Sequence, residues 1–426
     1  MVAVAAKPAD PQRNLEIFDR VWETVNETYF DAAFGGVDWA GLRASERPRA
    51  EAAESLRALS RILNDMLGQL GVTHFAVTGL GDDAFDAARL SDVVEDENIT
   101  EDPVWQGGYS GLALIELDGT VVVREVFADS PAQKAGVEAG MELLGVGERG
   151  ALAVRDDLEA SGVTGARLRH IWPERLQRLL DGQAPGTERT LRLRQANGRQ
   201  VVQTLRLAAR PVEFSEELGY MPAQPMVFTH RELGEGMDYV HFNLFLPQLM
   251  PRIREAVLGA RQGLILDLRG NAGGVGLMAG GVAGLLIDER LKLGRSQLRT
   301  GWLGFVGFPQ RGAFSGPVAV LIDAATGSTA ELLAGGLQQA GRARVFGQTS
   351  AGAAMASLFT ELPGGGRFQY VVGDLILPDG TRLDGTGVVP DVSIPLTRQT
   401  LASPQDETLE AALAWLYAEL APVNTP

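Results

Sequence analysis

The sequence predicts a multidomain α/β protein, and three observations support this prediction. The chain has 426 residues, a length that suggests roughly two to three domains. Its N-terminal part carries apolar residues at helical spacing, and its middle part alternates apolar with polar residues as half-buried strands do. Its third part alternates strand-like with helix-like runs, which is typical of an α/β sheet with crossover helices.

Composition narrows the class of protein. Hydrophobic residues make up 45% and charged residues 22%, as in ordinary globular proteins. The net charge of −16 argues against nucleic acid or an anionic membrane as the main partner. The absence of cysteine excludes disulfides, thiol catalysis and thiolate metal sites.

No apolar run is long enough to span a bilayer, so the sequence predicts a soluble chain without a transmembrane segment. The first residues, Met1–Pro8, lack the charged start and long apolar core of a secretory signal. The compartment stays open between the cytoplasm and, if a signal peptide was removed, the periplasm or exterior. The oligomeric state stays open as well.

Residues 1–100 are expected to form an N-terminal helical region and a linker. Two or three helices are predicted between Asn14 and Leu70, with an interruption near Gly35. A short strand-like piece, Val72–Leu80, precedes an acidic loop or linker, Asp82–Asp102. The apolar stripes of the helices are Leu15, Phe18, Val21, Trp22 and Val25, then Leu56, Leu59, Ile62, Leu63 and Met66.

Residues 107–211 are expected to form a small β-rich domain with a helical insertion around Leu168–Leu180. A helix should begin at Ser130 and Pro131. The pattern resembles a PDZ domain. In that family the glycine-flanked loop offers backbone amides to a peptide's C-terminal carboxylate, and the next strand pairs with the peptide. The resemblance assigns that loop to Tyr109, Ser110, Gly111 and Leu112.

Residues 225–400 are expected to form an α/β core, followed by a C-terminal helix within 401–426. The predicted strands are Tyr239–Phe245, Gly263–Leu268 and Val318–Ile322. The predicted helices are Leu277–Ile287, Ala330–Ala340 and the tail helix Asp406–Leu420.

Ser328 is the candidate nucleophile. It lies on a turn of small residues between the buried strand Val318–Ile322 and an amphipathic helix. Such a turn exposes a hydroxyl beside unpaired backbone N–H groups at a helix N-terminus, and these can hold an oxyanion. The alternative interpretation is that Ser328 or Thr329 only caps the helix, with Glu331 in its first turn.

Three motifs together resemble the S41 peptidases, the family of tail-specific or C-terminal processing proteases. They are Asp-Leu-Arg-Gly-Asn-Ala-Gly-Gly at 267–274, Gly-Ser-Thr-Ala-Glu at 327–331 and Gly-Thr-Gly-Val-Val-Pro-Asp at 385–391. Together with the helical start and the PDZ-like segment, the resemblance covers roughly residues 15–420 of the chain. The resemblance implies a crotonase-like α/β catalytic core, a serine peptidase activity, and no metal or cofactor.

The general base cannot be the lysine that many bacterial members of this family use. The matching turn places Ala353 at the lysine position, and the chain's lysines are Lys7, Lys134 and Lys292. Arginine has too high a pKa to act as a base near neutral pH. A histidine therefore remains.

The resemblance to tricorn-type members, which use a Ser/His/Ser/Glu tetrad, implies His74 as the base. Thr73 then takes the place of the first serine, Ser328 is the nucleophile, and Asp384 takes the place of the glutamate. Asp384 is one methylene shorter than glutamate. Two plain interpretations stay open: His74 as a polar residue at a strand edge, and Asp384 as an ordinary turn residue.

The remaining polar candidates have more ordinary interpretations. One oxyanion donor is expected at the amide of Thr329, and another at Gly273 or Gly274, between which the sequence does not choose. Asp267 and Arg269 are expected to form a structural ion pair. His241 and His170 are expected to be structural and solvated, respectively.

The sequence thus predicts a serine endopeptidase that cleaves peptides or unfolded protein tails through an acyl-enzyme, with a PDZ-like domain that binds substrate. One alternative is a non-catalytic member of the same fold that binds peptides or small apolar ligands. Another is an esterase or other acyl hydrolase that uses the same residues.

Overall fold

The structure is a computed structural model that describes residues 10–80, 107–160, 165–209, 213–403 and 405–421. The acidic stretch 82–102 and the first residues lie outside the described part. Contacts divide the chain into two compact units: residues 1–81, 212–395 and 407–426 form the first, and residues 82–211 with 396–406 form the second. The prediction of a multidomain α/β fold is confirmed, while the four predicted domain boundaries stay a proposal.

Three N-terminal helices cover one sheet of the first unit: α1 (Pro11–Thr28), α2 (Trp39–Glu51) and α3 (Leu56–Gly68). Asp10 and Ser55 cap α1 and α3 through their side-chain oxygens. The chain turns between α1 and α2 in the short 3₁₀ helix η1 (Phe34–Gly36), where Gly35 has a φ of 65°. The buried faces of the helices pack on Phe368 and Val371 of the sheet.

A mostly parallel sheet forms the centre of this unit. Its order is β10-β11-β12-β15-β16-β19, and only β10 is antiparallel to its neighbour. β12 and β15 are entirely buried because helices cover both faces. The strands are β10 (Phe228–Glu232), β11 (Met237–Phe242), β12 (Gly263–Asp267), β15 (Val318–Ile322), β16 (Arg344–Gly347) and β19 (Val392–Ser393).

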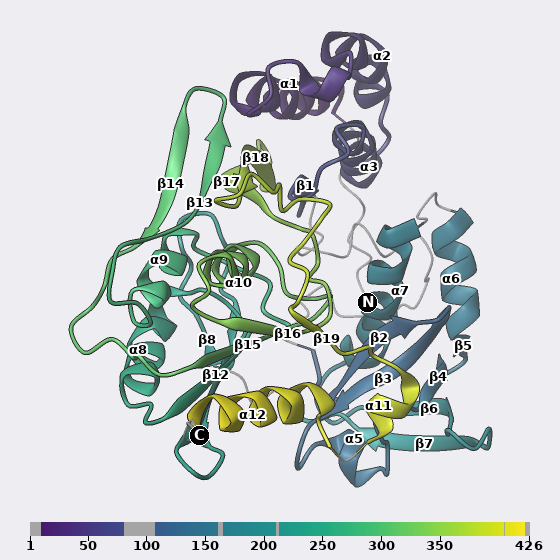
Figure 1. Cartoon of the computed structure of the whole chain (residues 1–426). Helices are drawn as coiled ribbons and strands as arrows, with labels where there is room; N and C mark the ends of the chain where they lie inside the picture. The colour runs from purple at the N-terminus through teal and green to yellow at the C-terminus, as the bar shows by residue number, and fades with distance from the viewer. Residues whose placement is uncertain (1–9, 81–106, 161–164, 210–212, 404, 422–426) are drawn as a thin grey trace. The chain divides into compact units, whose positions relative to one another are not determined.

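The two faces of this sheet pack on different helices. One face packs on α8 (Met250–Leu258), preceded by η3 (Pro247–Leu249), and on α9 (Leu277–Ala283) and α10 (Thr329–Gln339). The other packs on α12 (Glu407–Leu420), through Ala412 and Leu416, drawn in yellow in Figure 1. Since β12 and β15 are parallel neighbours, the loops that follow them meet at the same edge of the sheet.

The sequence did not indicate the second sheet of this unit. Its long strand β18 pairs with β1, β13 and β17, and β14 extends the sheet as a hairpin with β13, in green in Figure 1. The strands are β1 (Ala76–Thr78), β13 (Leu291–Leu298), β14 (Trp302–Gly307), β17 (Met355–Glu361) and β18 (Arg367–Ile376); β8 (Glu213–Phe214) and β9 (Pro225–Met226) form a separate pair.

The second unit is a sheet of order β2-β3-β4-β6-β7, with β5 beside β4 and with β2 at an edge. Its apolar face packs on α6 and α7. Its elements are β2 (Leu112–Leu117), β3 (Thr120–Val126), α5 (Pro131–Lys134), β4 (Glu142–Val146), β5 (Arg149–Gly150), α6 (Ala151–Ala160), α7 (Gly165–Asp181), β6 (Glu188–Arg194), β7 (Gln200–Arg206) and α11 (Arg398–Ala402).

Some element boundaries differ from the predicted ones. The helix predicted to reach Ile287 ends at Ala283, with Gly284 as its C-cap. The strand predicted over Val72–Leu80 contains only the three residues of β1. Within the described ranges, no helix has both the length and the apolarity that a membrane span requires.

Candidate functional site

Ser328 occupies a strained turn between β15 and α10. Its φ of 54° and ψ of −119° lie outside the β region usual for a helix cap, and such strain in a non-glycine residue marks candidate functional positions. Its N–H donates to the backbone oxygen of Ala353 at 2.9 Å and to Glu331 Oε2 at 2.8 Å. The side chain is half-buried.

The loop at 268–276 lies directly against this turn. A Cβ built on Gly273 would meet the Ser328 Cβ at 2.6 Å and the Thr329 amide nitrogen at 3.0 Å. The Thr329 hydroxyl donates to the Gly274 carbonyl oxygen at 2.9 Å, and the Gly327 N–H donates to that of Asn271 at 2.9 Å. The loop and the nucleophile turn are therefore fixed to each other.

The structure distinguishes between the two glycine donors that the sequence left open. The Gly273 N–H already donates to Asn271 Oδ1 at 2.9 Å. Among the described residues, no acceptor is bonded to the amide of Gly274, nor to that of Thr329 at the first position of α10. Gly274 and Thr329 are thus the amides available to an oxyanion.

Thr73, His74 and Asp384 lie in one hydrogen-bonded chain. The Thr73 hydroxyl donates to Asp384 Oδ1, and its oxygen lies 2.8 Å from His74 Nδ1. Because a hydroxyl has one proton and Asp384 receives it, Nδ1 must be the donor to Thr73. The imidazole therefore carries its proton on Nδ1, which leaves the Nε2 lone pair free to accept one.

The backbone and surroundings of His74 are unusual. Its φ is 67°, in a region that non-glycine residues seldom adopt. Burial lowers the pKa of His74 from its ordinary 6.5, and the nearby charge of Asp384 opposes part of that change. The imidazole is therefore neutral at neutral pH, as a general base requires.

Asp384 reaches Thr73 even though its side chain is one methylene shorter than that of glutamate. It follows the turn at 377–381, and the Leu383 N–H beside it donates to the Leu375 carbonyl oxygen at 3.0 Å. Besides the Thr73 hydroxyl, its carboxylate accepts the N–H of Thr73 at 3.4 Å and that of Ala354 at 3.2 Å. The structure therefore gives Asp384 the contacts that the tetrad mapping requires, beyond those of a solvated turn residue.

Glu331 is a polar residue of the site whose role the sequence did not indicate beyond a first-turn cap. It is fully buried on α10, and four donors surround its carboxylate. Burial raises the pKa of Glu331, while its hydrogen bonds act in the opposite direction. The available signal was a charged glutamate among the small and apolar residues of the first turns of this helix.

Asp267 and Arg269 form the expected ion pair, 2.6 Å long. Burial alone would raise the pKa of Asp267, but the Arg269 guanidinium outweighs it and holds that pKa below its usual range. His241 donates from Nδ1 to the Asp267 carbonyl oxygen at 3.0 Å, and His230 pairs with Asp238. The side chain of His170 lies outside the described part.

The predicted carboxylate-binding loop of the second unit is partly occupied. The Tyr109 N–H donates to the Ala208 carbonyl oxygen at 2.8 Å, and the Ser110 N–H donates to Asp181 Oδ1 at 3.0 Å. These two amides are therefore unavailable to a peptide carboxylate, which corrects the expectation that the whole loop offers its amides. Gly111, with a φ of 76°, and Leu112, at the start of the edge strand β2, remain.

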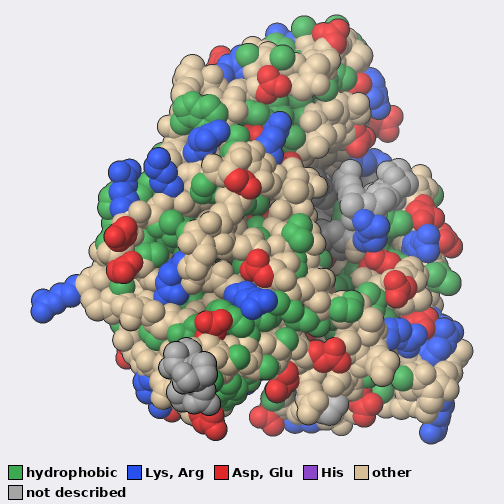
Figure 2. Space-filling view, in the orientation of Figure 1, with side chains coloured by type: hydrophobic (Ala, Val, Ile, Leu, Met, Phe, Trp, Pro, Cys, Tyr) green, Lys and Arg blue, Asp and Glu red, His purple; other side chains and the backbone are tan. Residues whose placement is uncertain are grey.

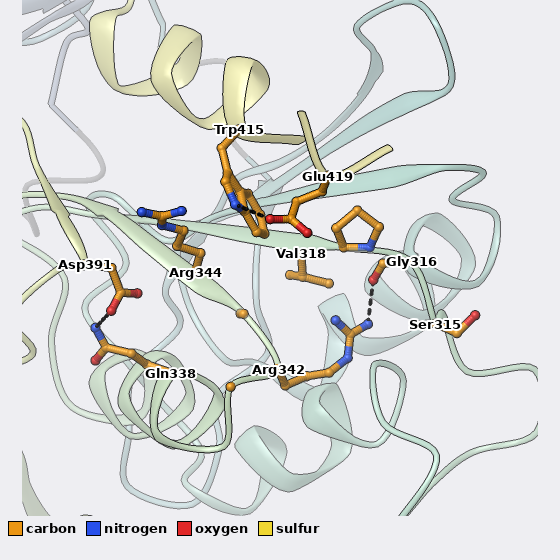
Figure 3. A pocket seen from close by; sticks show the side chains of 12 residues that line it. Ser315, Gly316, Val318, Gln338, Arg342, Arg344, Asp391, Trp415 and Glu419 are labelled. Carbon is orange, nitrogen blue, oxygen red and sulfur yellow. Dashed lines mark hydrogen bonds between the residues drawn. The ribbon is translucent and has the colours of Figure 1, made fainter. Parts of the chain in front are cut away.

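The first unit also has a pocket, which Figure 3 shows from close by. It is lined by Val318, at the start of β15, whereas Ser328 follows the end of that strand. Several of its polar side chains are paired: Trp415 donates to Glu419 at 3.0 Å, and Gln338 to Asp391 at 3.0 Å.

Two family models match parts of this chain. A model described as peptidase family S41 matches residues 239–394, and one described as the tricorn protease C1 domain matches residues 10–68. The carboxyl-terminal-processing protease of Picosynechococcus is 25% identical over 94% of this chain and 89% of its own length. Tricorn protease homolog 1 of Streptomyces coelicolor is 25% identical over 96% of this chain and 36% of its own length.

The fold also resembles a solved structure, the photosystem II D1 C-terminal processing protease. The TM-score is 0.56 at 20% sequence identity, over 95% of this chain and 98% of that one. This likeness concerns the fold.

Proposed function

We propose that this chain, a serine-type peptidase whose residues 239–394 match the model of peptidase family S41, is an endopeptidase that acts through an acyl-enzyme on Ser328. The observation that supports this best is the chain of contacts Asp384–Thr73–His74, which places the imidazole proton on Nδ1. A general base that activates a serine nucleophile is usually oriented by a third group in this way.

In the proposed mechanism, the Ser328 hydroxyl attacks the substrate carbonyl and passes its proton to His74 Nε2. The amides of Thr329 and Gly274 hold the developing oxyanion. His74 then gives the proton to the leaving amine, and a water molecule, activated by the same imidazole, hydrolyses the ester. Thr73 and Asp384 hold the imidazole in the required tautomer and stabilise its cationic form.

We infer that peptides or unfolded protein tails are the substrates. A strand at the edge of a sheet can pair with an extended peptide, and β2 has that position in the second unit. Figure 2 shows acidic and basic side chains interspersed over the face in view, so no broad basic surface suited to nucleic acid is seen there. An exported location stays a prediction.

Labelling with a fluorophosphonate probe, followed by peptide mapping of the adduct, tests the proposal. Covalent modification of Ser328 together with cleavage of an unstructured peptide is the expected result. An unmodified serine would instead favour a non-catalytic binding protein of the same fold. Labelling with ester hydrolysis but no peptide cleavage would favour an acyl hydrolase.

A further inference from the structure

The carboxylate of Glu331 joins the nucleophile turn to the turn at 350–354. Its Oε2 accepts the N–H of Ser328 at 2.8 Å and that of Ala353 at 3.2 Å. Its Oε1 accepts the Ser350 hydroxyl at 2.6 Å and the N–H of Gly352 at 2.8 Å. A fully buried group with four donors fixes the relative positions of the segments that supply them.

The turn at 350–354 is bonded in addition to the segment that carries Asp384. The Ala354 N–H donates to Asp384 Oδ1 at 3.2 Å. The Gly385 N–H donates to the Gly352 carbonyl oxygen at 2.8 Å, and the Val388 N–H donates to the Ser350 hydroxyl oxygen at 2.6 Å. The turn therefore lies between the nucleophile on one side and the acid on the other.

We propose that Glu331 is a positioning residue: by clamping the turn at 350–354, it sets where Asp384 meets Thr73 and His74 relative to Ser328. The inference rests on the function proposed above, because it names a residue that supports the same site. Glu331 would act on the imidazole only through the turn and Asp384, since no bond joins the carboxylate to Thr73 or His74 in the described residues.

Only an ionised carboxylate satisfies all four donors. A glutamine of the same shape has one acceptor oxygen, and its NH₂ group would face two of the donors. Glu331→Gln therefore breaks bonds to the turn while it preserves the volume of the side chain. Two buried donors lose their acceptor, and the turn is expected to shift.

The first test is a double-mutant cycle on the rate of Ser328 acylation by a fluorophosphonate. Glu331→Gln should slow acylation by roughly 10- to 100-fold, as expected for two hydrogen bonds of about 1 kcal/mol or more each. The same change in an Asp384→Asn background should slow it by less than about 5-fold, because coupled residues are not additive. Equal factors in both backgrounds would overturn the proposal.

The second test does not need activity. The titration of His74 is followed by NMR of the imidazole carbons in the full chain, with His74→Ala to assign the signal. The charge of Asp384 raises the pKa of His74, so Asp384→Asn should lower it. Glu331→Gln should lower it in the same direction, and the double variant should add nothing further. A His74 titration unchanged by Glu331→Gln would overturn the proposal.

Controls separate positioning from loss of stability. Asp238→Asn removes a buried carboxylate near the start of β11, far along the strand from the nucleophile edge, and should leave the His74 titration unchanged. Ser350→Ala keeps the Glu331 carboxylate and removes one of its donors. It should therefore change the pKa of His74 by less than Glu331→Gln does. If the peptidase function failed, wild-type chain would show no labelling, whereas the NMR result would still decide the role of Glu331.

Discussion

At the scale of single residues, protonation and backbone strain decide what the site can do. Because the Thr73 hydroxyl donates its one proton to Asp384 in a hydrogen bond, His74 can only donate to the Thr73 oxygen, from Nδ1. Ser328 has a positive φ, and its N–H donates to the Ala353 carbonyl oxygen and to the Glu331 carboxylate. The hydrogen bond to Thr73 thus sets the tautomer of His74, and the backbone bonds set the conformation of Ser328.

Replacement of the nucleophile gives the first prediction. Ser328→Ala should lower the rate of peptide hydrolysis by on the order of 10⁴-fold or more, with little change in the free energy of unfolding because the backbone and the buried neighbours stay the same. Activity and thermal unfolding are measured side by side. Ser315→Ala, an exposed position, is the control, and retained hydrolysis in Ser328→Ala would refute the assignment.

The pH dependence gives the second prediction. Because burial lowers the pKa of His74 below 6.5, activity should fall as pH drops through a value under 6.5, where the imidazole takes up a proton. Below 6.5 the unfolded chain binds this proton more readily than the folded one, so His74 also lowers stability there. The measurement is kcat/KM against pH.

Two histidine variants check that interpretation. His74→Ala should abolish activity, whereas His241→Ala should leave the acid limb in place. An active His74→Ala enzyme would move the search to another base.

At the scale of elements, two loops meet because two strands are parallel neighbours. β12 and β15 deliver 268–276 and 323–328 to one edge of the sheet. Glycine is required where these loops touch: at Gly273 the φ is 99° and any Cβ would collide with Ser328. The close approach is what brings the Thr329 and Gly274 amides to one place.

A glycine pair in this loop gives the third prediction. Gly273→Ala should reduce acylation of Ser328 by about 10²-fold or more, because its Cβ would collide with Ser328 and displace the neighbouring amides of Thr329 and Gly274 from the oxyanion. It should also destabilise the fold. Gly270→Ala is the matched control, because Gly270 has a φ of 70° but nothing within 4 Å of its added Cβ.

In both variants alanine must adopt a left-handed backbone conformation, which costs about 1–2 kcal/mol. The midpoint temperature of thermal unfolding should therefore fall in each. Only Gly273→Ala should lose labelling. Equal labelling by the two variants would show that close contact with Ser328 is unimportant.

At the scale of the whole molecule, the chain combines a catalytic unit with a smaller β-rich unit, each with its own core. The second unit offers an edge strand, β2, and two loop amides that remain after Tyr109 and Ser110 are bonded internally. Whether this unit recognises a free C-terminus therefore depends on Gly111 and Leu112.

Peptide binding by the full chain gives the fourth prediction. With Ser328→Ala to prevent turnover, a peptide with a free carboxylate and an apolar end should bind about tenfold more tightly than its amide, since a charge-assisted hydrogen bond contributes about 1.5 kcal/mol. Calorimetric titration measures both affinities. Equal values would mean that the unit binds extended segments irrespective of a chain end.

The sequence by itself determined the fold class, the nucleophile candidate and the elimination of a lysine base. These follow from local information: periodicity, a small-residue turn at Ser328, and the residue that stands at Ala353. Buried strands such as Val318–Ile322 were predicted with their bounds because an apolar run between turn residues has few other interpretations.

Only the tertiary structure decided how the distant parts of the site meet. Thr73 and Asp384 are 311 residues apart in sequence, and no periodicity reports a contact of that range. The role of Glu331 was hidden because a first-turn glutamate is also an ordinary cap; its meaning depends on donors from the turn at 350–354. The choice of Gly274 over Gly273 depends likewise on which amide Asn271 has already taken.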